Sequence, residues 1–281
     1  MVRYRCKVNT LVLKIMKNVF LSALFAVFIL YILQIFFAHR EGQFVPDYPK
    51  VKLTKETDYN TFLKQTGLGR ASVEKLVERG EFSKILDYQE RFFESPKVKC
   101  TSMLGWFTRE DRVENETKIR DEFSFVDAQP GDILVTLSTH SVGWRHGHAG
   151  LVIDENTVLE CGVWGENSAL KNINYWSGYS NYALLRIKDV TPELQLKVKA
   201  YALAHLKGVP YHLSAGFLGK KAPDVNASYF GLQCAYLVWY AWNAFGYDVD
   251  ADGGRLVTAS DILYSDCVEI VQCYGLDIVY K

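Results

Sequence analysis

The sequence predicts an α+β fold with a largely antiparallel sheet. From Glu122 onward, short apolar runs are separated by turns, which is typical of β-strands. Helical patterns lie among these runs, but the regular strand–helix–strand alternation of a parallel sheet is not seen. Of the 281 residues, 49% are hydrophobic and 14% are aromatic, so the chain can bury a sizeable core, as one large domain or as one domain with an appendage.

The N-terminal segment predicts a membrane anchor. Residues 1–18 carry five basic side chains and no acidic one, and the twenty residues Val19–Ala38 that follow are uncharged and almost entirely apolar. At a helical rise of about 1.5 Å per residue, such a segment spans ~30 Å and can cross a bilayer. A buried globular helix and a cleaved signal peptide are the alternatives, but Phe36-Phe37-Ala38 is a poor cleavage site. The basic flank predicts that residues 1–18 are cytoplasmic and that everything after His39 lies outside.

Charge and cysteine content narrow the function classes. The 32 basic and 32 acidic residues balance, so no nucleic-acid-binding surface is expected. Five of the six cysteines follow the predicted anchor, and an odd number leaves at least one without a disulfide partner in the chain. The sequence contains no CxxC pair, which disfavours a structural zinc site, and we expect neither a metal nor another cofactor.

The chain divides into four predicted parts. These are a cytoplasmic basic segment (1–18), a transmembrane anchor (19–38), a linker with a helical region (39–121) and a catalytic domain (122–281). The last boundary lies in a mixed, polar segment that begins at residue 96. The helical region is interpreted as a stalk, a cap on the catalytic domain or a regulatory segment, because its charged residues suggest only a solvated face.

Three helices are expected before that boundary. Asp58 is a candidate N-cap of a first short helix, and Ser72 is the expected N-cap of a second one that ends at Gly80. Phe82–Phe93 has the apolar spacing of a third.

The catalytic domain is expected to mix strands and helices. Thr191 and Pro192 open a helix that ends at Gly208. Another helix starts near Cys234, and a short one covers Ala259–Tyr264. The expected strands are Ile133–Leu137, His148–Ile153, Val158–Cys161, Tyr182–Ile187, a strand near Val268–Gln272 and one near Asp277–Tyr280.

Cys234 is the candidate nucleophile. It opens a strongly apolar helix within Phe230–Phe245, and a helix N-terminus carries partial positive charge and free N–H groups that favour a thiolate over a thiol. The alternative is a buried structural cysteine, since free Cys is among the most buried residue types.

His148 is the candidate base for this nucleophile. It clusters with His140 and His146 in a loop and the strand that follows it. His146 and His148 could together hold a metal, but neither an HExxH motif nor a clear carboxylate ligand accompanies them. A histidine that opens an apolar strand can also be a hydrogen-bonded core residue.

Glu160 is the candidate partner of His148. If residues 154–156 form the turn of a hairpin, Ile153 faces Thr157, and Glu160 becomes the diagonal neighbour of His148 at a Cα separation of ~7–8 Å. A buried Glu needs a partner, because an unpaired buried carboxylate is costly. One residue more or fewer in the turn would put Glu160 on the opposite face.

Four motifs carry a resemblance to a known family. They are PGDIL (130–134), GHAGLVI (147–153), GVPY (208–211) and QCAYLVWYAW (233–242). They resemble the motifs of NlpC-type, papain-like cell-wall peptidases, but in a different chain order. The order is similar to that of the circularly permuted branch, the YaeF/YiiX-type amidases, which are related to lecithin–retinol acyltransferases. The resemblance covers about residues 122–281, and LVTASDILYSD (256–266) also looks like a segment of that branch.

The resemblance implies roles for four residues. Cys234 would be the nucleophile, His148 the base, Glu160 the third polar residue, and Tyr211 a tyrosine that lines the site. Gln233 stands where the unpermuted family usually has Asp, and His140 and His146 are additional histidines. The N–H of Cys234, with Tyr211 or Gln233, is the expected oxyanion donor.

The predicted function is a membrane-anchored cysteine amidase or peptidase. It would hydrolyse an amide bond through a thioester intermediate, on a peptide substrate of the bacterial cell envelope. One alternative is transfer or hydrolysis of fatty acyl groups, in keeping with the predicted anchor and the aromatic-rich Cys234 helix. The other is a non-catalytic envelope binding module that has kept the fold.

Overall fold

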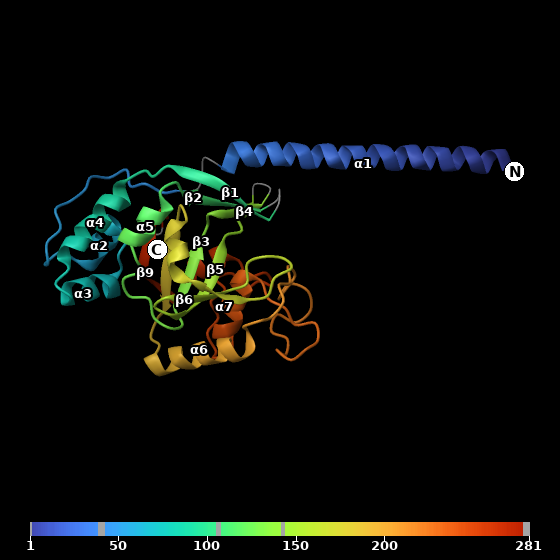
Figure 1. Ribbon diagram of the computed structural model, residues 1–281. Helices are drawn as coiled ribbons and strands as arrows, with labels where there is room; N and C mark the ends of the chain where they lie inside the picture. The colour runs from blue at the N-terminus through green and yellow to red at the C-terminus, as the bar shows by residue number, and fades with distance from the viewer. Residues whose placement is uncertain (1, 39–42, 105–107, 142–143, 278–281) are drawn as a thin grey trace.

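Two antiparallel sheets organise the part of the chain that the structure describes (Figure 1). The structure is a computed structural model that describes residues 2–38, 43–104, 108–141 and 144–277. The larger sheet has the order β7-β6-β5-β3-β8-β9 and the smaller one the order β1-β2-β4, and every pairing within them is antiparallel. The α+β prediction with an antiparallel sheet is therefore confirmed.

Five of the six strands of the larger sheet follow the predicted apolar runs closely, and the edge strand β7 was not predicted. The six strands are β3 (Ile133–Thr136), β5 (His148–Asp154), β6 (Thr157–Glu160), β7 (Ala169–Asn172), β8 (Tyr182–Ile187) and β9 (Val268–Tyr274). The strand predicted near Asp277–Tyr280 lies, from residue 278 on, outside the described residues.

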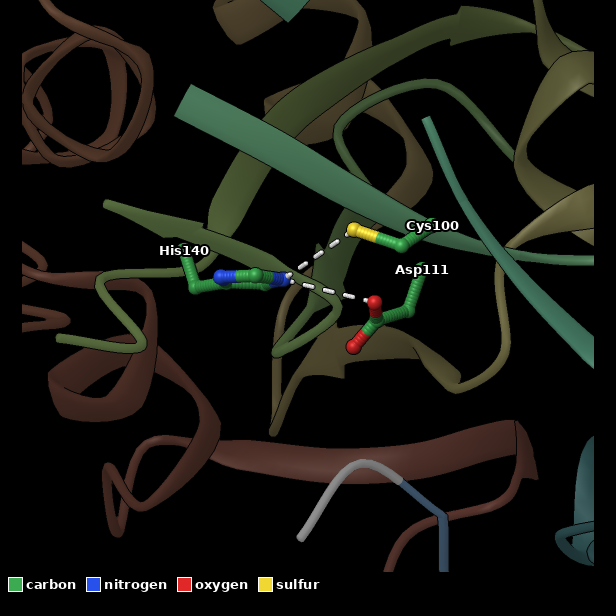
Figure 2. Close-up of side chains that lie close together, drawn as sticks. All are labelled: Cys100, Asp111 and His140. Atoms are coloured by element: carbon green, nitrogen blue, oxygen red, sulfur yellow. Dashed lines mark hydrogen bonds and ion pairs between the residues drawn. The ribbon is translucent and has the colours of Figure 1, made fainter. Parts of the chain in front are cut away.

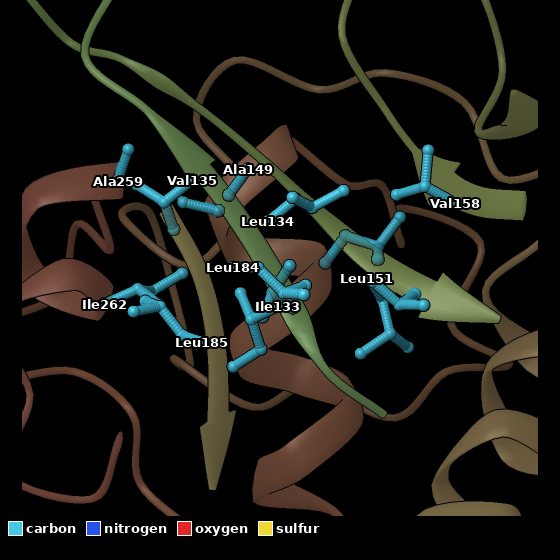
Figure 3. Packing of buried hydrophobic residues seen from close by; sticks show 14 of the residues in the cluster. Ile133, Leu134, Val135, Ala149, Leu151, Val158, Leu184, Leu185, Ala259 and Ile262 are labelled. Atoms are coloured by element: carbon cyan, nitrogen blue, oxygen red, sulfur yellow. The ribbon is translucent and has the colours of Figure 1, made fainter. Parts of the chain in front are cut away.

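Helix α7 (Cys234–Asn243) packs against β5 on one face of this sheet. Every residue from Ala235 to Trp242 is buried, which explains why the segment is apolar on all sides rather than amphipathic. The strands on the other side of this core are also shielded from solvent. Ile133, Leu134 and Val135 of β3 are all 0% exposed (Figure 3). This packing brings Cys234, the first residue of α7, to the same cavity as His148, the first residue of β5.

Both flanking helices begin with a side-chain cap, of which Thr191 was predicted and Thr258 was not. In α6 (Pro192–His205), the Thr191 side chain accepts a hydrogen bond from the Leu194 N–H. In α8 (Ala259–Leu263), Thr258 and Asp261 form a reciprocal capping box. Both helices match the predicted segments.

The helical region before the sheets has its own small core. It comprises α2 (Tyr59–Thr66), α3 (Arg70–Glu78) and α4 (Phe82–Phe93). Their shared core is formed by Leu53, Phe62, Leu68, Val73, Leu76, Ile85, Tyr88 and Val126.

One of the two predicted caps in this region is correct. Asp58 caps α2 by accepting from the Thr61 N–H at 3.0 Å. The prediction for Ser72 is wrong, because α3 already starts after Gly69. The Gly69 N–H donates to the Val271 carbonyl at 2.9 Å, and the buried Ser72 hydroxyl donates to the same carbonyl at 2.8 Å. Docking onto β9 therefore sets the start of α3.

The polar segment 96–121, where the sequence places a boundary, contains regular structure. It holds β1 (Val98–Leu104), β2 (Thr108–Val113) and the start of α5 (Glu116–Glu122). Strand β2 pairs with β4 (Thr139–Ser141), which lies beyond the predicted boundary. The boundary stays a prediction, but one sheet joins its two sides.

The N-terminal helix α1 (Val2–Ala38) extends away from both sheets (Figure 1). Its segment Val12–Ile32 has a mean hydropathy of 2.1, is not buried, and is long and apolar enough to cross a membrane. Near the end of that segment, the Tyr31 hydroxyl accepts a hydrogen bond from Arg109 Nη2 of β2 at 2.8 Å. This contact joins the apolar helix to the smaller sheet.

Two glycines test the docking of the helical region. Gly67 (φ 71°) and Gly80 (φ 72°) have the same left-handed backbone, but a Cβ on Gly67 would lie 2.0 Å from the Cys273 carbonyl oxygen, whereas a Cβ on Gly80 would meet nothing within 4 Å. We expect Gly80→Ala to destabilise the fold by about 1–2 kcal/mol. We expect Gly67→Ala to cost at least about 1 kcal/mol more, because the strand must also shift. Urea denaturation of the detergent-solubilised chain measures the difference, and equal midpoints for the two variants would contradict the docking.

Candidate active site

The hairpin of β5 and β6 brings His148 and Glu160 together. Leu151 pairs with Leu159 and Val152 with Val158, which is the predicted register of the strand bodies. The turn itself differs from the expected one, because Asp154 pairs with Thr157 and Ile153 forms a bulge. The turn is one residue shorter than expected, and the bulge adds one residue to β5. The two changes leave the register of the strand bodies unaltered, so Glu160 stays on the same sheet face as His148. The His148 Nε2 and Glu160 Oε2 atoms lie 2.9 Å apart.

Trp176 completes this pair, although the sequence analysis did not identify it. It lies in the 3₁₀ helix η1 (Ile173–Gly178) and is fully buried. Its Nε1–H donates to Glu160 Oε1 at 2.7 Å, and its ring stacks on the His148 ring at 5.2 Å between centroids, with an interplanar angle of 14°. The Glu160 carboxylate could have indicated a further partner. Each of its two oxygens needs a hydrogen-bond donor when it is buried, and His148 supplies only one.

Cys234 stands at the first position of α7, where Gln233 is the N-cap. Gln233 Oε1 accepts from the Ala235 N–H at 3.0 Å, and Gln233 Nε2 donates to the Val257 carbonyl at 2.8 Å. The Gln233 side chain thus starts the helix and ties it to the segment before α8. That Gln233 donates a hydrogen bond to an oxyanion stays a prediction. One of its two amide hydrogens is already bonded to the Val257 carbonyl.

The Cys234 thiol donates a hydrogen bond to Gln233 Oε1, with Sγ and Oε1 3.4 Å apart, and it lies close enough to His148 for each group to shift the pKa of the other. Burial raises the pKa of the Cys234 thiol, but the interaction with His148, the charge of that ring and the backbone N–H groups of Ala149 and Ala235 together lower it below its usual value. Burial likewise lowers the pKa of His148, but its interactions with Cys234 and Glu160 outweigh burial and raise it well above its usual value. The two shifts together favour a thiolate–imidazolium pair.

His148 lies between Glu160 and the cavity of Cys234. Its Nε2 contacts Glu160 Oε2, and its ring lines the same cavity as Cys234. Gly162 lies directly beside the ring, since a Cβ there would sit 3.1 Å from His148 Cε1. A side chain at position 162 would therefore require a shift of about a few tenths of an ångström between it and the ring.

Two cavities meet at His148. One, of about 420 Å³, holds Cys234 and Tyr211, and its walls are mainly apolar, with contributions from Trp144, Trp164 and Leu213. The other, of about 770 Å³, is lined largely by polar and charged side chains, among them Glu110, Arg120, Glu166 and Lys171. His148, Gly162 and Val163 line both.

The remaining candidates are placed as follows. Tyr211 lines the Cys234 cavity, and burial together with the charge of Cys234 raises its pKa. His146 contacts Ser141 Oγ at 3.0 Å and the Gly147 carbonyl at 2.8 Å, so both of its ring nitrogens are directed to partners other than His148. His140 belongs to a different cluster, on the smaller sheet.

Comparisons with known proteins add little to this geometry. No protein-family model matches the chain, and no curated protein is significantly similar to it. Among solved structures, the chain is similar to the metalloprotein YiiX of Escherichia coli O157:H7, with 17% identity and a TM-score of 0.39, over 51% of this chain and 96% of that one. So distant a likeness does not assign a family, and the site is therefore interpreted from its own residues.

The pH dependence of alkylation tests the Cys234–His148 pair. Because the thiolate is the reacting form, a lowered pKa moves the rise in reaction rate to lower pH. We therefore expect the rate of Cys234 alkylation by iodoacetamide to rise at a pH below the free-thiol pKa of about 8.5. Substitution of His148 by Ala should move this rise upward. Mass spectrometry follows each cysteine in the detergent-solubilised full chain.

The other cysteines serve as internal controls in this experiment. Burial raises the pKa of Cys161 and of Cys273 to about 12, so both should stay unmodified while the protein is folded. A Cys234 whose profile matches that of the half-buried Cys267, and which is indifferent to His148→Ala, would contradict the pair.

Proposed function

We propose that the protein is a cysteine hydrolase or acyltransferase that works through a thioester on Cys234. The single observation that supports this most is the position of His148, which is hydrogen-bonded to Glu160, is stacked on Trp176 and lines the cavity of Cys234. A nucleophile, a base and an orienting group are thus gathered in one site.

The chemistry follows from the charges of the pair. The Cys234 thiolate attacks the carbonyl carbon of an amide or ester, and the N–H of Cys234, in the first turn of α7 where N–H groups lack intrahelical acceptors, stabilises the oxyanion. The His148 imidazolium then protonates the leaving amine or alcohol. Neutral His148 next takes a proton from water or another acceptor, which attacks the thioester and frees the thiolate. Glu160 holds the ring and balances its charge throughout.

A peptide amide is the first candidate substrate. The polar cavity beside His148 carries both acidic and basic side chains, Glu166, Lys171 and Arg120 among them, and offers partners for a peptide backbone and its charged ends. This substrate class agrees with the resemblance of the four motifs to permuted papain-like amidases, and we propose membership of that family on the order of those motifs. With α1 as an anchor and its basic flank inside, the site would face the cell envelope.

A lipid acyl group is the second candidate, and a separate observation favours it. The cavity of Cys234 is rimmed by large apolar side chains that are strongly exposed, namely Trp144 (56%), Trp164 (73%) and Leu213 (71%). The same cavity is lined by Thr108, the neighbour of Arg109, which holds Tyr31 of the apolar helix. An acyl chain that leaves the membrane surface would therefore have a short path to the nucleophile.

Product analysis distinguishes the two substrate classes. The solubilised chain is incubated with muropeptides and, separately, with phospholipid vesicles, and the products are identified by mass spectrometry. We expect one class to be cleaved, and Cys234→Ala to lose at least about 10³-fold in rate, because the nucleophile is essential. Cys267→Ala, which removes a half-buried cysteine outside the site, is the matched control and should retain wild-type activity. Equal rates for Cys234→Ala and the wild type would exclude thioester catalysis and favour a binding module.

A further inference from the structure

A second cluster of chemically reactive side chains lies on the smaller sheet (Figure 2). Cys100 of β1, Asp111 of β2 and His140 of β4 come from its three strands. Cys100 pairs with Asp111, and His140 pairs with Arg109, two residues before Asp111, so all three side chains project from one face. Their sulfur, oxygen and nitrogen atoms lie within 4.8 Å of one another.

The cluster does not have the geometry of a catalytic relay. A catalytic relay uses the two ring nitrogens of a histidine for two different partners. At His140, both Cys100 Sγ (3.9 Å) and Asp111 Oδ1 (3.3 Å) approach the same atom, Nε2 (Figure 2). Three donor atoms that converge on one point are instead arranged like the ligands of an ion.

The separations agree with a tetrahedral metal. Bond lengths of about 2.3 Å to sulfur, 2.0–2.1 Å to nitrogen and 2.0–2.2 Å to oxygen give ligand–ligand edges of roughly 3.6 Å for sulfur–nitrogen and 3.4 Å for nitrogen–oxygen. The observed edges are 3.9 and 3.3 Å. We propose that Cys100, Asp111 and His140 bind a divalent transition-metal ion of the zinc type, with water or another ligand at the fourth position.

The surroundings fit a metal ligand set. Asp111 and His140 are 3% and 0% exposed, and Asp111 Oδ2 accepts a hydrogen bond from Arg145 Nη2 at 2.9 Å, which leaves Oδ1 to face the cluster. Such a bond from an outer residue orients a ligating carboxylate. The thiolate and the carboxylate would together neutralise the ion. Arg109 lies near Cys100 and would have to move aside for the ion to reach the sulfur.

The position of the cluster indicates a structural role. Thr108, Thr139 and Ser141 project from the opposite face of the same strands and line the Cys234 cavity. An ion held by all three strands would fix this cavity wall without touching the substrate. The expectation that the chain binds no metal rested on the lack of a CxxC pair, whereas these ligands are distant in sequence and meet only in the folded sheet.

Cobalt binding tests the proposal independently of activity. The detergent-solubilised full chain is freed of metal with a chelator and titrated with Co²⁺. We expect one equivalent to give the sulfur-to-cobalt charge-transfer band and the visible bands of tetrahedral Co²⁺, and Zn²⁺ to abolish both. Cys100→Ser should remove the charge-transfer band, and His140→Ala should weaken binding at least tenfold. Cys234→Ala and Cys267→Ser should leave the spectrum unchanged.

Failure of the metal site can be distinguished from failure of the proposed function, because the cobalt spectra do not depend on catalysis. Spectra without these bands in the wild-type protein would overturn the metal site, and so would bands that persist in Cys100→Ser but vanish in Cys234→Ala. Folding of each variant is checked through the protection of Cys161 and Cys273 from alkylation. If Asp111→Asn also folds and binds Co²⁺ as tightly as the wild type, Asp111 is not a ligand and the three-residue site is wrong.

Discussion

The candidate site depends on the carboxylate of Glu160. One of its oxygens contacts His148 Nε2 and the other accepts from Trp176 Nε1, so its position and that of the histidine ring are set together. A buried imidazolium needs such a counter-charge, because breaking a buried pair by removing one partner costs about 3–5 kcal/mol. With Glu160 in place, His148 can hold its proton in the interior, and that proton in turn stabilises the Cys234 thiolate.

Elements that are distant in sequence hold this carboxylate in position. The Tyr175 and Tyr179 hydroxyls donate to Glu110 of β2 at 3.0 and 2.7 Å, which ties η1, and with it Trp176, to the smaller sheet. The same sheet forms a wall of the apolar cavity through β2 and β4 and contacts the apolar helix through Arg109. The smaller sheet thus supports the site, forms a wall of the cavity and contacts the apolar helix.

The sequence predicted those parts of the site that local patterns encode. Alternation and turn signals placed His148 and Glu160 on one face, and the apolar run after Cys234 predicted the buried α7. The register was correct although the turn was not, because a bulge compensated for the shorter turn. Trp176 and the cluster of Cys100, Asp111 and His140 escaped prediction, since their partners are set by tertiary pairing of β1, β2, β4 and η1. Ser72 was misassigned as a cap for the same reason, because contact with β9 starts α3 earlier.

The protonation state of His148 is the most direct test of this account. Nuclear magnetic resonance of the ¹⁵N-histidine-labelled chain, with His148→Gln to assign the signal, reports whether the ring is charged. We predict that His148 remains an imidazolium well above the ordinary histidine pKa of about 6.5, and that Cys234→Ser lowers its pKa because the sulfur anion is lost. A ring that is neutral at pH 7 and insensitive to Cys234→Ser would contradict the thiolate–imidazolium pair, and with it the proposed chemistry.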